Sequence, residues 1–323
     1  MTLAKIAKMA NVAVSTVSKA FSDSPEISDE TKALIIKIAK ETGCYEKYYK
    51  PKYSKKLIAV ICPEMLGNQY AQMATFLEQG ITRRGGTMLL SVSDFSADKQ
   101  NELIDYYAKF AHVNGIIVIE PVSKIKAITD VPIIQISLDK DNGDVHAIYA
   151  DMGDALSKSI NKLKNYGHQN FGFIGEKRTA KELELFRNTA ARCGVTVHPK
   201  HVSVNEYRFH DCGYYGIDEM IHKGSLPTAI YAAYSHIAVG ILQRLNEEQI
   251  KVPEDISVVC LNDISGVPYG SLNVSCIKMQ LEEICSETIH LLYRILAKHH
   301  GVSKHTITVE RQFSEGESIG KVK

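Results

Sequence analysis

A short stretch near the start of the chain, VSTVSKAF at residues 14–21, carries hydroxyl and ammonium groups on one side. If the stretch is helical, Val17 and Phe21 face a core. The side chains left on the outer side are Val14, Ser15, Ser18 and Lys19. Hydroxyls can donate to phosphate oxygens or base edges and a lysine can donate to guanine, so such a helix fits the major groove of DNA. The alternative is a plain three-helix structural domain with a solvated polar face.

Three helices are predicted around this stretch, within residues 2–42. Thr2 and Ser28 stand where N-caps belong, and Gly43 follows the third helix as a C-terminal glycine should. The break at ANVAV, residues 10–14, makes the short turn of a helix-turn-helix. The apolar residues at helical spacing are Leu3, Ile6, Ala7 and Ala10, then Val14, Val17 and Phe21, then Leu34, Ile35, Ile38 and Ala39.

The chain after Lys56 alternates predicted strands and helices. Segments such as residues 70–84 and 151–166 have helical spacing and separate short aliphatic runs. This alternation predicts βαβ units, whose parallel sheets are covered on both faces. About 265 residues of this kind predict two α/β lobes rather than one. The runs are LIAVIC, TMLLSV, GIIVIE, PIIQIS, NFGFIG, TAIYAA and ISVVCL.

Positive charge is concentrated at the start of the chain, although the formal net charge of the whole is only +1. Up to Lys56 there are 11 lysines against 6 acidic residues, whereas the rest has 27 Lys and Arg against 31 acidic residues. A first part of formal charge +5 on a body of −4 is expected when one end of a protein meets a polyanion. The junction, YEKYYKPKYSKK at residues 45–56, alternates tyrosines with lysines and has no aliphatic side chain.

Several classes of protein are excluded by what the sequence lacks. The seven cysteines are scattered and never in C-x-x-C spacing, so neither a disulfide framework nor a zinc site is predicted. There is no apolar run long enough for a membrane span and no secretion signal, so we expect a cytoplasmic protein. No P-loop, G-x-S-x-G or G-x-G-x-x-G motif occurs, and His168 has no second metal ligand at i+4. We therefore expect no catalytic residue, no metal site and no cofactor.

The segment at residues 2–43, TLAKIAKMANVAVSTVSKAFSDSPEISDETKALIIKIAKETG, resembles the DNA-binding head of the LacI/GalR family of bacterial transcription regulators. The likeness is most specific at VSTVS and continues in the body through VNGIIVIEP, YGHQNFGFIG, LPTAIYAA and VPEDISVVCLND. The resemblance implies a dimeric regulator, usually a repressor. It also implies a two-lobed effector domain of the periplasmic-binding-protein type I-like fold, with a ligand cleft between the lobes.

On this basis we expect a small all-α helix-turn-helix head followed by two α/β lobes with parallel sheets. The predicted domains are a DNA-binding domain at 1–44, a basic Tyr/Lys linker at 45–56 and an effector-binding and dimerisation domain at 57–323. The chain should cross between the lobes near residue 150, at 265–280 and near 300. The expected partners are double-stranded operator DNA, a small-molecule effector and a second copy of the chain, with no membrane.

Carried over residue by residue, the family pattern places Val14, Ser15 and Lys19 at bases. The whole set of expected DNA-binding residues is Thr2, Val14, Ser15, Thr16, Ser18, Lys19, Ser22, Lys50, Lys52 and Lys55. The match has gaps, since Asn11 stands for the turn glycine and Ala13 for a capping serine. Asn tolerates the left-handed backbone that the turn needs. The family's linker carries a leucine that wedges between base pairs in the minor groove and kinks the DNA, and no such residue is present in this linker. We therefore expect the linker lysines to contact phosphates without a sharp bend in the DNA. A solvated linker is the alternative.

The positions that hold sugar hydroxyls in the family are changed in this chain. Glu182 replaces an arginine, Tyr234 an asparagine and Asn262 an aspartate. One interpretation is a different ligand, with an amine for Glu182 and a ring for Tyr234; the other is a cleft that binds nothing strongly. The candidate ligand-binding residues are Asn68, Tyr70, Ser137, Glu182, Tyr234 and Asn262.

Two rival functions share parts of this pattern. A transport protein of the solute-binding fold would have the two lobes but would need a signal peptide, and an α/β enzyme would need a nucleophile and a base. The main alternative is a cytoplasmic small-molecule-binding protein with little DNA specificity. The expected function is a sequence-specific DNA-binding regulator, usually a repressor in the family, whose operator affinity a sugar or related metabolite controls.

Overall fold

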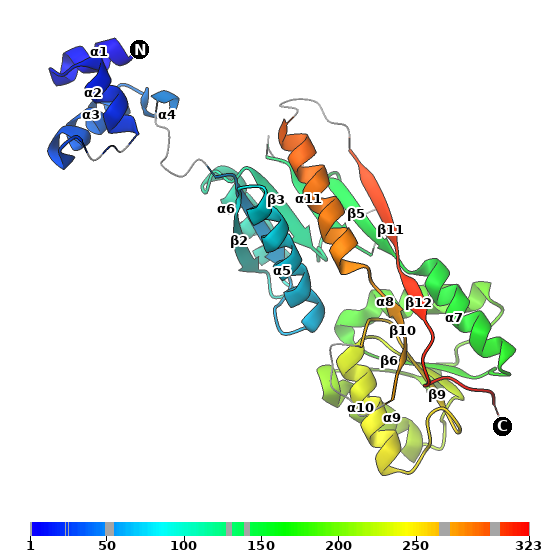
Figure 1. The fold of residues 1–323 in the computed structure, drawn as a ribbon. Coiled ribbons are helices and arrows are strands. Elements are labelled where there is room, and N and C mark those ends of the chain that lie inside the picture. The colour runs from blue at the N-terminus through cyan, green and yellow to red at the C-terminus, as the bar shows by residue number, and fades with distance from the viewer. Residues whose placement is uncertain are drawn as a thin grey trace. The chain divides into compact units, whose positions relative to one another are not determined.

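The structure is a computed structural model that describes residues 2–22, 24, 26–48, 55–126, 131–138, 143–264, 272–297 and 304–322. The chain divides into two compact units, residues 1–56 and 57–323 (Figure 1). Two of the expected DNA contacts, Lys50 and Lys52, lie outside the described residues.

The first unit is built on three helices around one small core. The turn after α1 uses Asn11, whose φ of 53° lies in the left-handed region, as the sequence predicts. Ser28 caps α3 by accepting a hydrogen bond from Thr31 N at 3.3 Å, whereas the side chain of Thr2 makes no such bond to α1. The helices are α1 Leu3–Ala10, α2 Val14–Phe21 and α3 Asp29–Glu41. Their fully buried core residues include Ile6, Val17, Phe21 and Ile35.

A fourth short helix, α4 at Tyr45–Tyr48, belongs to the same unit. The rings of Tyr45 and Tyr48 pack on Phe21 with centroids 6.3 and 6.0 Å away, and Cys44 is buried beside them. We expected the linker to begin at Tyr45. Instead, the first four residues of the Tyr/Lys segment complete the head, because their rings can cover its core.

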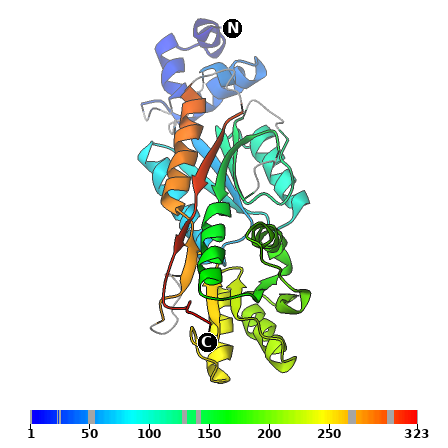
Figure 2. The ribbon, with the colours of Figure 1, turned by 90° about the vertical axis from the view of Figure 1, so that its right-hand side faces the viewer.

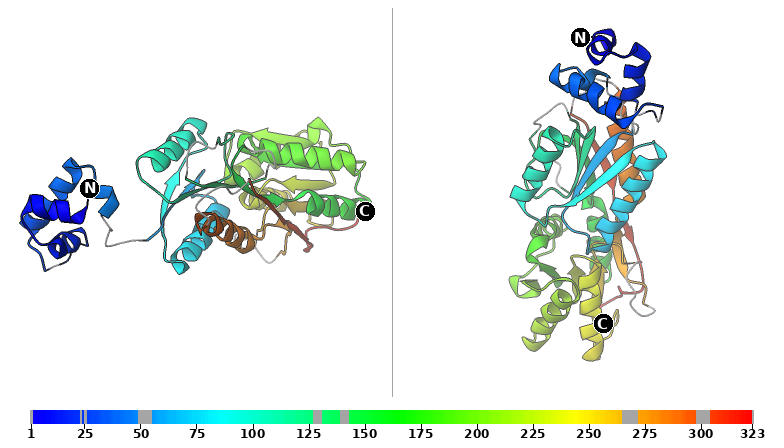
Figure 3. Two further views of the ribbon diagram at one scale, coloured as in Figure 1. Left: turned by 90° about the horizontal axis from the view of Figure 1, so that it is seen from above. Right: turned by 90° about the vertical axis from the view of Figure 1, so that its left-hand side faces the viewer.

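The first lobe of the second unit is, among the described residues, a six-stranded sheet in the order β11-β5-β4-β3-β1-β2. All neighbouring strands are parallel. Helix α6 covers one face, and α5 and α11 cover the other (Figure 3, left). The strands are β1 Leu57–Cys62, β2 Thr87–Val92, β3 Gly115–Ile119, β4 Ile133–Ser137, β5 His146–Asp151 and β11 Thr306–Glu310. The helices are α5 Asn68–Arg83, α6 Ala97–Lys109 and α11 Leu281–Ala297.

The second lobe has a sheet of similar design, with the described order β12-β10-β9-β8-β6-β7. Only its edge strand β12 runs antiparallel to its neighbour. The strands are β6 Phe171–Glu176, β7 Val202–Asn205, β8 Ala229–Ala232, β9 Ser257–Cys260, β10 Ser275–Lys278 and β12 Gln312–Ser314. The helices are α7 Gly153–Asn165, α8 Ala180–Arg192, α9 Phe209–His222 and α10 Ser235–Glu247. The predicted strands are confirmed in both lobes, and all but the edge strand β2 are buried on both faces, as parallel sheets require.

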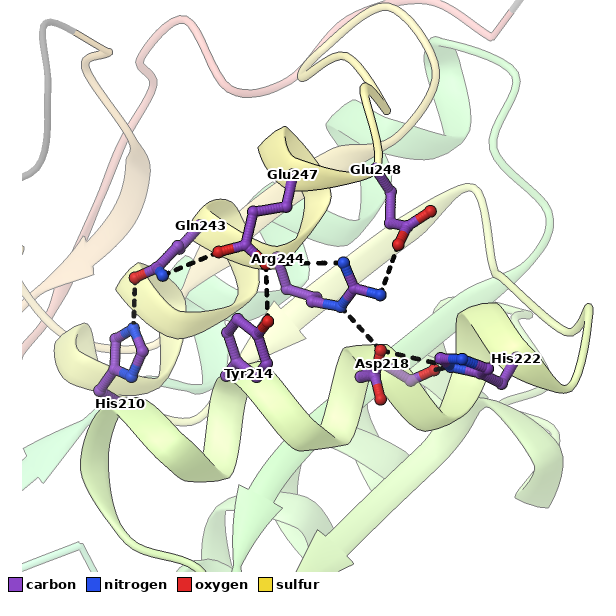
Figure 4. A network of polar contacts seen from close by, with 8 residues as sticks. All are labelled: His210, Tyr214, Asp218, His222, Gln243, Arg244, Glu247 and Glu248. Carbon is purple, nitrogen blue, oxygen red and sulfur yellow. Dashed lines mark hydrogen bonds and ion pairs between the residues drawn. The ribbon is translucent and has the colours of Figure 1, made fainter.

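Helices α9 and α10 pack against each other closely at two glycines, one on each helix. A Cβ atom on Gly213 would lie 2.0 Å from Ile237 O, and one on Gly240 would lie 2.0 Å from His210 O. Polar side chains hold the outer seam of the pair (Figure 4). Tyr214 donates to Glu247 at 2.6 Å and Arg244 donates to Asp218 at 2.7 Å. The backbones can approach this closely only because no side chain separates them at the two glycines.

The described chain passes between the two lobes three times. The first crossing joins β5 to α7, the second joins β10 to α11, and the third lies at Arg311, between β11 and β12 (Figures 1 and 2). We expected the third crossing near residue 300, and this is wrong. Residues 306–310 still pair with β5, since Thr306 stands beside Ala147 and Glu310 beside Asp151.

Candidate functional site

The outer face of α2 presents the polar groups that the sequence predicts there. Val14 is 47% exposed, and Ser15, Ser18 and Lys19 are exposed as well. Thr2 and Ser22 are exposed and Thr16 is half-buried. The described residues of the head therefore leave this face open to a partner.

One contact in the head concerns the lysine of this face directly. The Lys19 ammonium forms an ion pair with Glu26, which lies in the segment between α2 and α3. Both side chains are largely exposed, 48% for Lys19 and 64% for Glu26. Without DNA, the expected base-reading lysine is thus held by a carboxylate of its own domain.

A cavity of about 1080 Å³ lies between the two lobes and continues outward along α5 and α11. Residues from both lobes line it. Of the six candidate ligand-binding residues, the cavity is lined by Asn68, Tyr70, Glu182, Tyr234 and Asn262. The exception is Ser137, which is 1% exposed and does not line the cavity, whereas the next residue, Leu138, does. Successive residues of a strand point to opposite sides, so Leu138 and not Ser137 faces the cavity.

Charged groups from both lobes meet within this cavity. Arg208, which precedes α9, donates to Glu176 at 3.2 Å within its own lobe and to Glu64 of the other lobe at 3.0 Å. Arg178 lies 3.9 Å from the same Glu64, and its guanidinium sits 4.3 Å from the ring centre of Phe95. These contacts tie the two lobes together across the cavity.

A second group of charges surrounds Arg311, on the third crossing. Arg311 is 5% exposed and donates from Nη1 to Asn262 Oδ1 at 3.1 Å. Burial lowers the pKa of its guanidinium to about 10, although the nearby Glu120 and Glu182 act in the opposite direction. Burial, and then the charge of Glu182, raises the pKa of Glu120 to about 7; burial also raises the pKa of Glu182.

Aromatic rings form part of the wall on the side of the second lobe. Tyr234 accepts a hydrogen bond from Phe209 N at 3.0 Å, and the two rings meet edge to face with centroids 6.1 Å apart. Phe209 holds a left-handed φ of 54°, which turns the chain at the start of α9. Burial raises the pKa of the Tyr234 hydroxyl well above its ordinary value, so it stays a neutral phenol.

The sequence analysis missed the lining residues Glu64, Glu120, Glu176 and Arg311, and Arg208, which bonds to two of them. A signal for some of them existed. Glu64 closely follows β1, Glu120 directly follows β3 and Glu176 ends β6. Ligands of open parallel α/β sheets bind outside the carboxyl ends of the strands, so charged residues at these positions are candidates by rule. Arg311 has no such signal, since only the folded chain shows it to be a crossing.

Within the described residues, no group of three or more His, Cys, Asp or Glu side chains could hold a metal ion. The described helices include none that is both long and apolar enough to span a membrane.

Comparison with protein families gives a match in each unit. The model for bacterial regulatory proteins of the lacI family matches residues 2–46, and that for a periplasmic binding protein-like domain matches residues 160–319. The chain belongs to the LacI/GalR family. As a LacI-family transcription regulator it combines a helix-turn-helix DNA-binding domain with a ligand-binding domain of the periplasmic-binding-protein type.

Curated relatives of this LacI-family chain are similar over almost their whole length. The HTH-type transcriptional regulator AscG of Escherichia coli (strain K12) is 22% identical over 315 residues, which is 91% of this chain and 92% of AscG. The HTH-type transcriptional regulator GalR of Streptococcus thermophilus is 26% identical over 317 residues, with the same coverage of 91% and 92%. The prediction of a regulator rather than an enzyme is confirmed.

Solved structures of LacI-family proteins share the fold. The lac repressor dimer bound to operator and the anti-inducer ONPF matches with a TM-score of 0.71 and 17% identity over 98% of each chain. The complex of the transcriptional regulator CelR with cellobiose matches with a TM-score of 0.68 and 20% identity, over 98% of this chain and 99% of that one. The predicted fold class is confirmed.

Proposed function

We propose that the protein is a repressor whose affinity for operator DNA is controlled by a small polar metabolite bound between the two lobes. The observation that supports this most is the cavity itself, since its lining comes from both lobes and includes Arg311 on a crossing between them. A ligand that contacts both lobes can favour one lobe arrangement over another only through a difference in affinity. The proposed effector is a carbohydrate or an amine-bearing metabolite, held by Asn68, Tyr70, Glu182, Tyr234 and Asn262.

In the head we propose that Val14, Ser15 and Lys19 read bases. Thr2, Thr16, Ser18 and Ser22 are proposed to position the domain on the DNA backbone, as are Lys50, Lys52 and Lys55 of the linker. Phosphate contacts fix register, whereas base contacts supply specificity. The proposed form is a homodimer in the cytoplasm.

The test begins with the operator. Selection of binding sites from random DNA by the full-length protein should return one sequence, and its affinity should be compared with that for scrambled DNA. A screen of sugars, amino sugars, sugar phosphates and nucleosides by thermal shift then finds the effector, because a ligand at 100 times its Kd stabilises a fold by about 2.7 kcal/mol. The effector should change operator affinity but not scrambled-DNA affinity. Equal binding to all sequences would instead favour the small-molecule-binding protein with little DNA specificity.

A further inference from the structure

The inner part of the cavity holds two glutamates against one arginine. Glu120 follows β3, Glu182 lies in the first turn of α8, and Arg311 is the third crossing. Oε2 of Glu182 is buried and receives no hydrogen bond from the described residues, and Arg311 Nε likewise finds no acceptor among them. A buried carboxylate oxygen without a donor is costly, so this position favours a ligand that brings one.

The charges around this position do not cancel. Arg178 and Arg208 are engaged by Glu64 and Glu176, two cations against two anions. Near Glu182, Arg311 is the buried cation and Glu120 is a second carboxyl, whereas Lys181 is exposed. Tyr70 adds only a neutral phenol. Two carboxyls thus share one buried guanidinium.

We propose that the effector carries a positively charged amine that lies between Glu182 and Glu120, an inference that rests on the proposed function. A hydroxyl could donate to the Glu182 oxygen but would leave the excess charge in place, and an anionic ligand would add to it. An ammonium group both donates and neutralises. The raised pKa values of Glu120 and Glu182 agree with this geometry, because burial raises both and the opposing effect of Arg311 and Lys181 does not offset it.

The lining also suggests what the rest of the ligand looks like. Tyr70 and Tyr234 line the same cavity, together with the apolar Leu138 and Met152. An ammonium near aromatic faces is attracted by the ring quadrupole, and a sugar ring or a short carbon chain can pack on the apolar wall. Amino sugars and small aliphatic amines therefore fit better than neutral sugars or sugar phosphates.

The first experiment uses matched pairs of probes on the full-length protein. Thermal shift and calorimetry compare glucosamine with glucose, galactosamine with galactose, and putrescine with 1,4-butanediol. We expect at least one amine to bind at least about tenfold more tightly than its neutral partner, a preference that Glu182→Gln should remove. The control is Glu184→Gln, which takes one charge from an exposed position of the same helix that does not line the cavity. A neutral probe that binds as tightly as its amine partner would overturn the inference.

A second measurement needs no ligand. If Glu182 carries an uncompensated charge, Glu182→Gln should melt at a higher temperature than the wild-type protein at about pH 8, and the difference should shrink as the pH falls, because the raised pKa of the buried carboxyl favours its protonation. An equal or lower melting temperature at the higher pH would overturn the inference. The proposed function is judged separately, since a neutral sugar that releases the operator would refute the amine and leave the ligand-controlled repressor standing.

Discussion

Arg208 donates a hydrogen bond to Glu64 Oε1 across the cavity, at 3.0 Å, so a guanidinium of the second lobe holds a carboxylate of the first. The same guanidinium also holds Glu176 at 3.2 Å. Both carboxylates are nearly buried, with side-chain exposures of 11% for Glu64 and 6% for Glu176. The pairing therefore links the arrangement of the two lobes to the charge state of three side chains.

Replacing Arg208 by alanine should weaken this arrangement. Two nearly buried carboxylates would lose a charged donor, and we expect the free energy of unfolding to fall by about 1–3 kcal/mol. A bound effector should also dissociate faster. Chemical denaturation and stopped-flow release measure the two effects. The matched control is Arg192→Ala, which removes an exposed arginine of α8 that donates a hydrogen bond to Thr189. Equal losses in both variants would contradict the prediction.

Effector binding should depend on pH through Glu120. Its pKa is raised to about 7, by burial first and by Glu182 second, and a bound ammonium should lower it again. Binding of a glucosamine-type ligand would then release a proton, so affinity should fall by up to about tenfold per pH unit below about pH 7. Calorimetry in two buffers of different ionisation enthalpy counts the proton. The release should be lost in Glu120→Gln, and its persistence there would point to another group.

The raised pKa of Glu120 also makes the stability of the ligand-free protein depend on pH, in a definite direction. The folded state binds this proton more tightly than the unfolded state, whose carboxyl titrates near 4.5. The contribution of Glu120 to stability therefore decreases as the pH rises from about 4.5 to about 7 and is constant above that range.

DNA affinity should rise when Glu26 is neutralised. The Lys19 ammonium must leave Glu26 to reach a base, and an exposed ion pair of this kind contributes about 0.2–1 kcal/mol. Glu26→Gln should strengthen operator binding by up to about fivefold in a titration at low salt. Glu30→Gln removes the same charge elsewhere in the head and serves as the control. An equal gain in both variants would mean general electrostatics and not release of Lys19.

The linker lysines should appear in the salt dependence of binding. If Lys50, Lys52 and Lys55 meet phosphates, replacing them by glutamine should reduce the slope of log K against log salt by up to about 0.9 for each lost contact. Filter binding over a range of salt concentrations gives the slope. An unchanged slope would make the linker a spacer.

A methyl group between α9 and α10 should be poorly tolerated. The Cβ atom of Gly240→Ala would lie 2.0 Å from His210 O, which is backbone and cannot simply rotate away. We expect a loss of about 1–3 kcal/mol in the free energy of unfolding. Gly213→Ala should behave alike, and the double variant should lose less than the sum, since one separation of the helices relieves both clashes. Full additivity in urea denaturation would contradict this.

The sequence predicts the fold well where burial is continuous. Runs such as LIAVIC and ISVVCL became strands because both faces of a parallel sheet are covered. Three of the four edge strands were missed, because β7 and β11 mix exposed and buried residues and β12 is only three residues long. The interior strands β5 and β10 were missed as well, although they are largely buried. The length of the head was also underestimated. A segment of tyrosines and lysines gives no sign in the sequence of belonging to a core, and only the folded structure shows that Tyr45 and Tyr48 pack on Phe21.

The candidate site was predictable only in part. Glu182, Tyr234 and Asn262 line the cavity at positions that the family pattern supplies. Glu64 and Arg208 could not be paired from the sequence, because 144 positions separate them and only the approach of two lobes brings them together. The same holds for Arg311, whose place beside Glu120 depends on where the chain leaves the first sheet.

The position of β11 in the first sheet has a consequence for synthesis on the ribosome. Strand β5 cannot pair with its parallel neighbour β11 until the second lobe up to β10, and then α11, have been synthesised. Until residues 306–310 emerge, the first sheet has an unpaired edge at β5, the kind of edge on which chains aggregate. Truncation before residue 306 would leave that edge permanently open. Strand β11, close to the end of the chain, thus completes the lobe that was synthesised first.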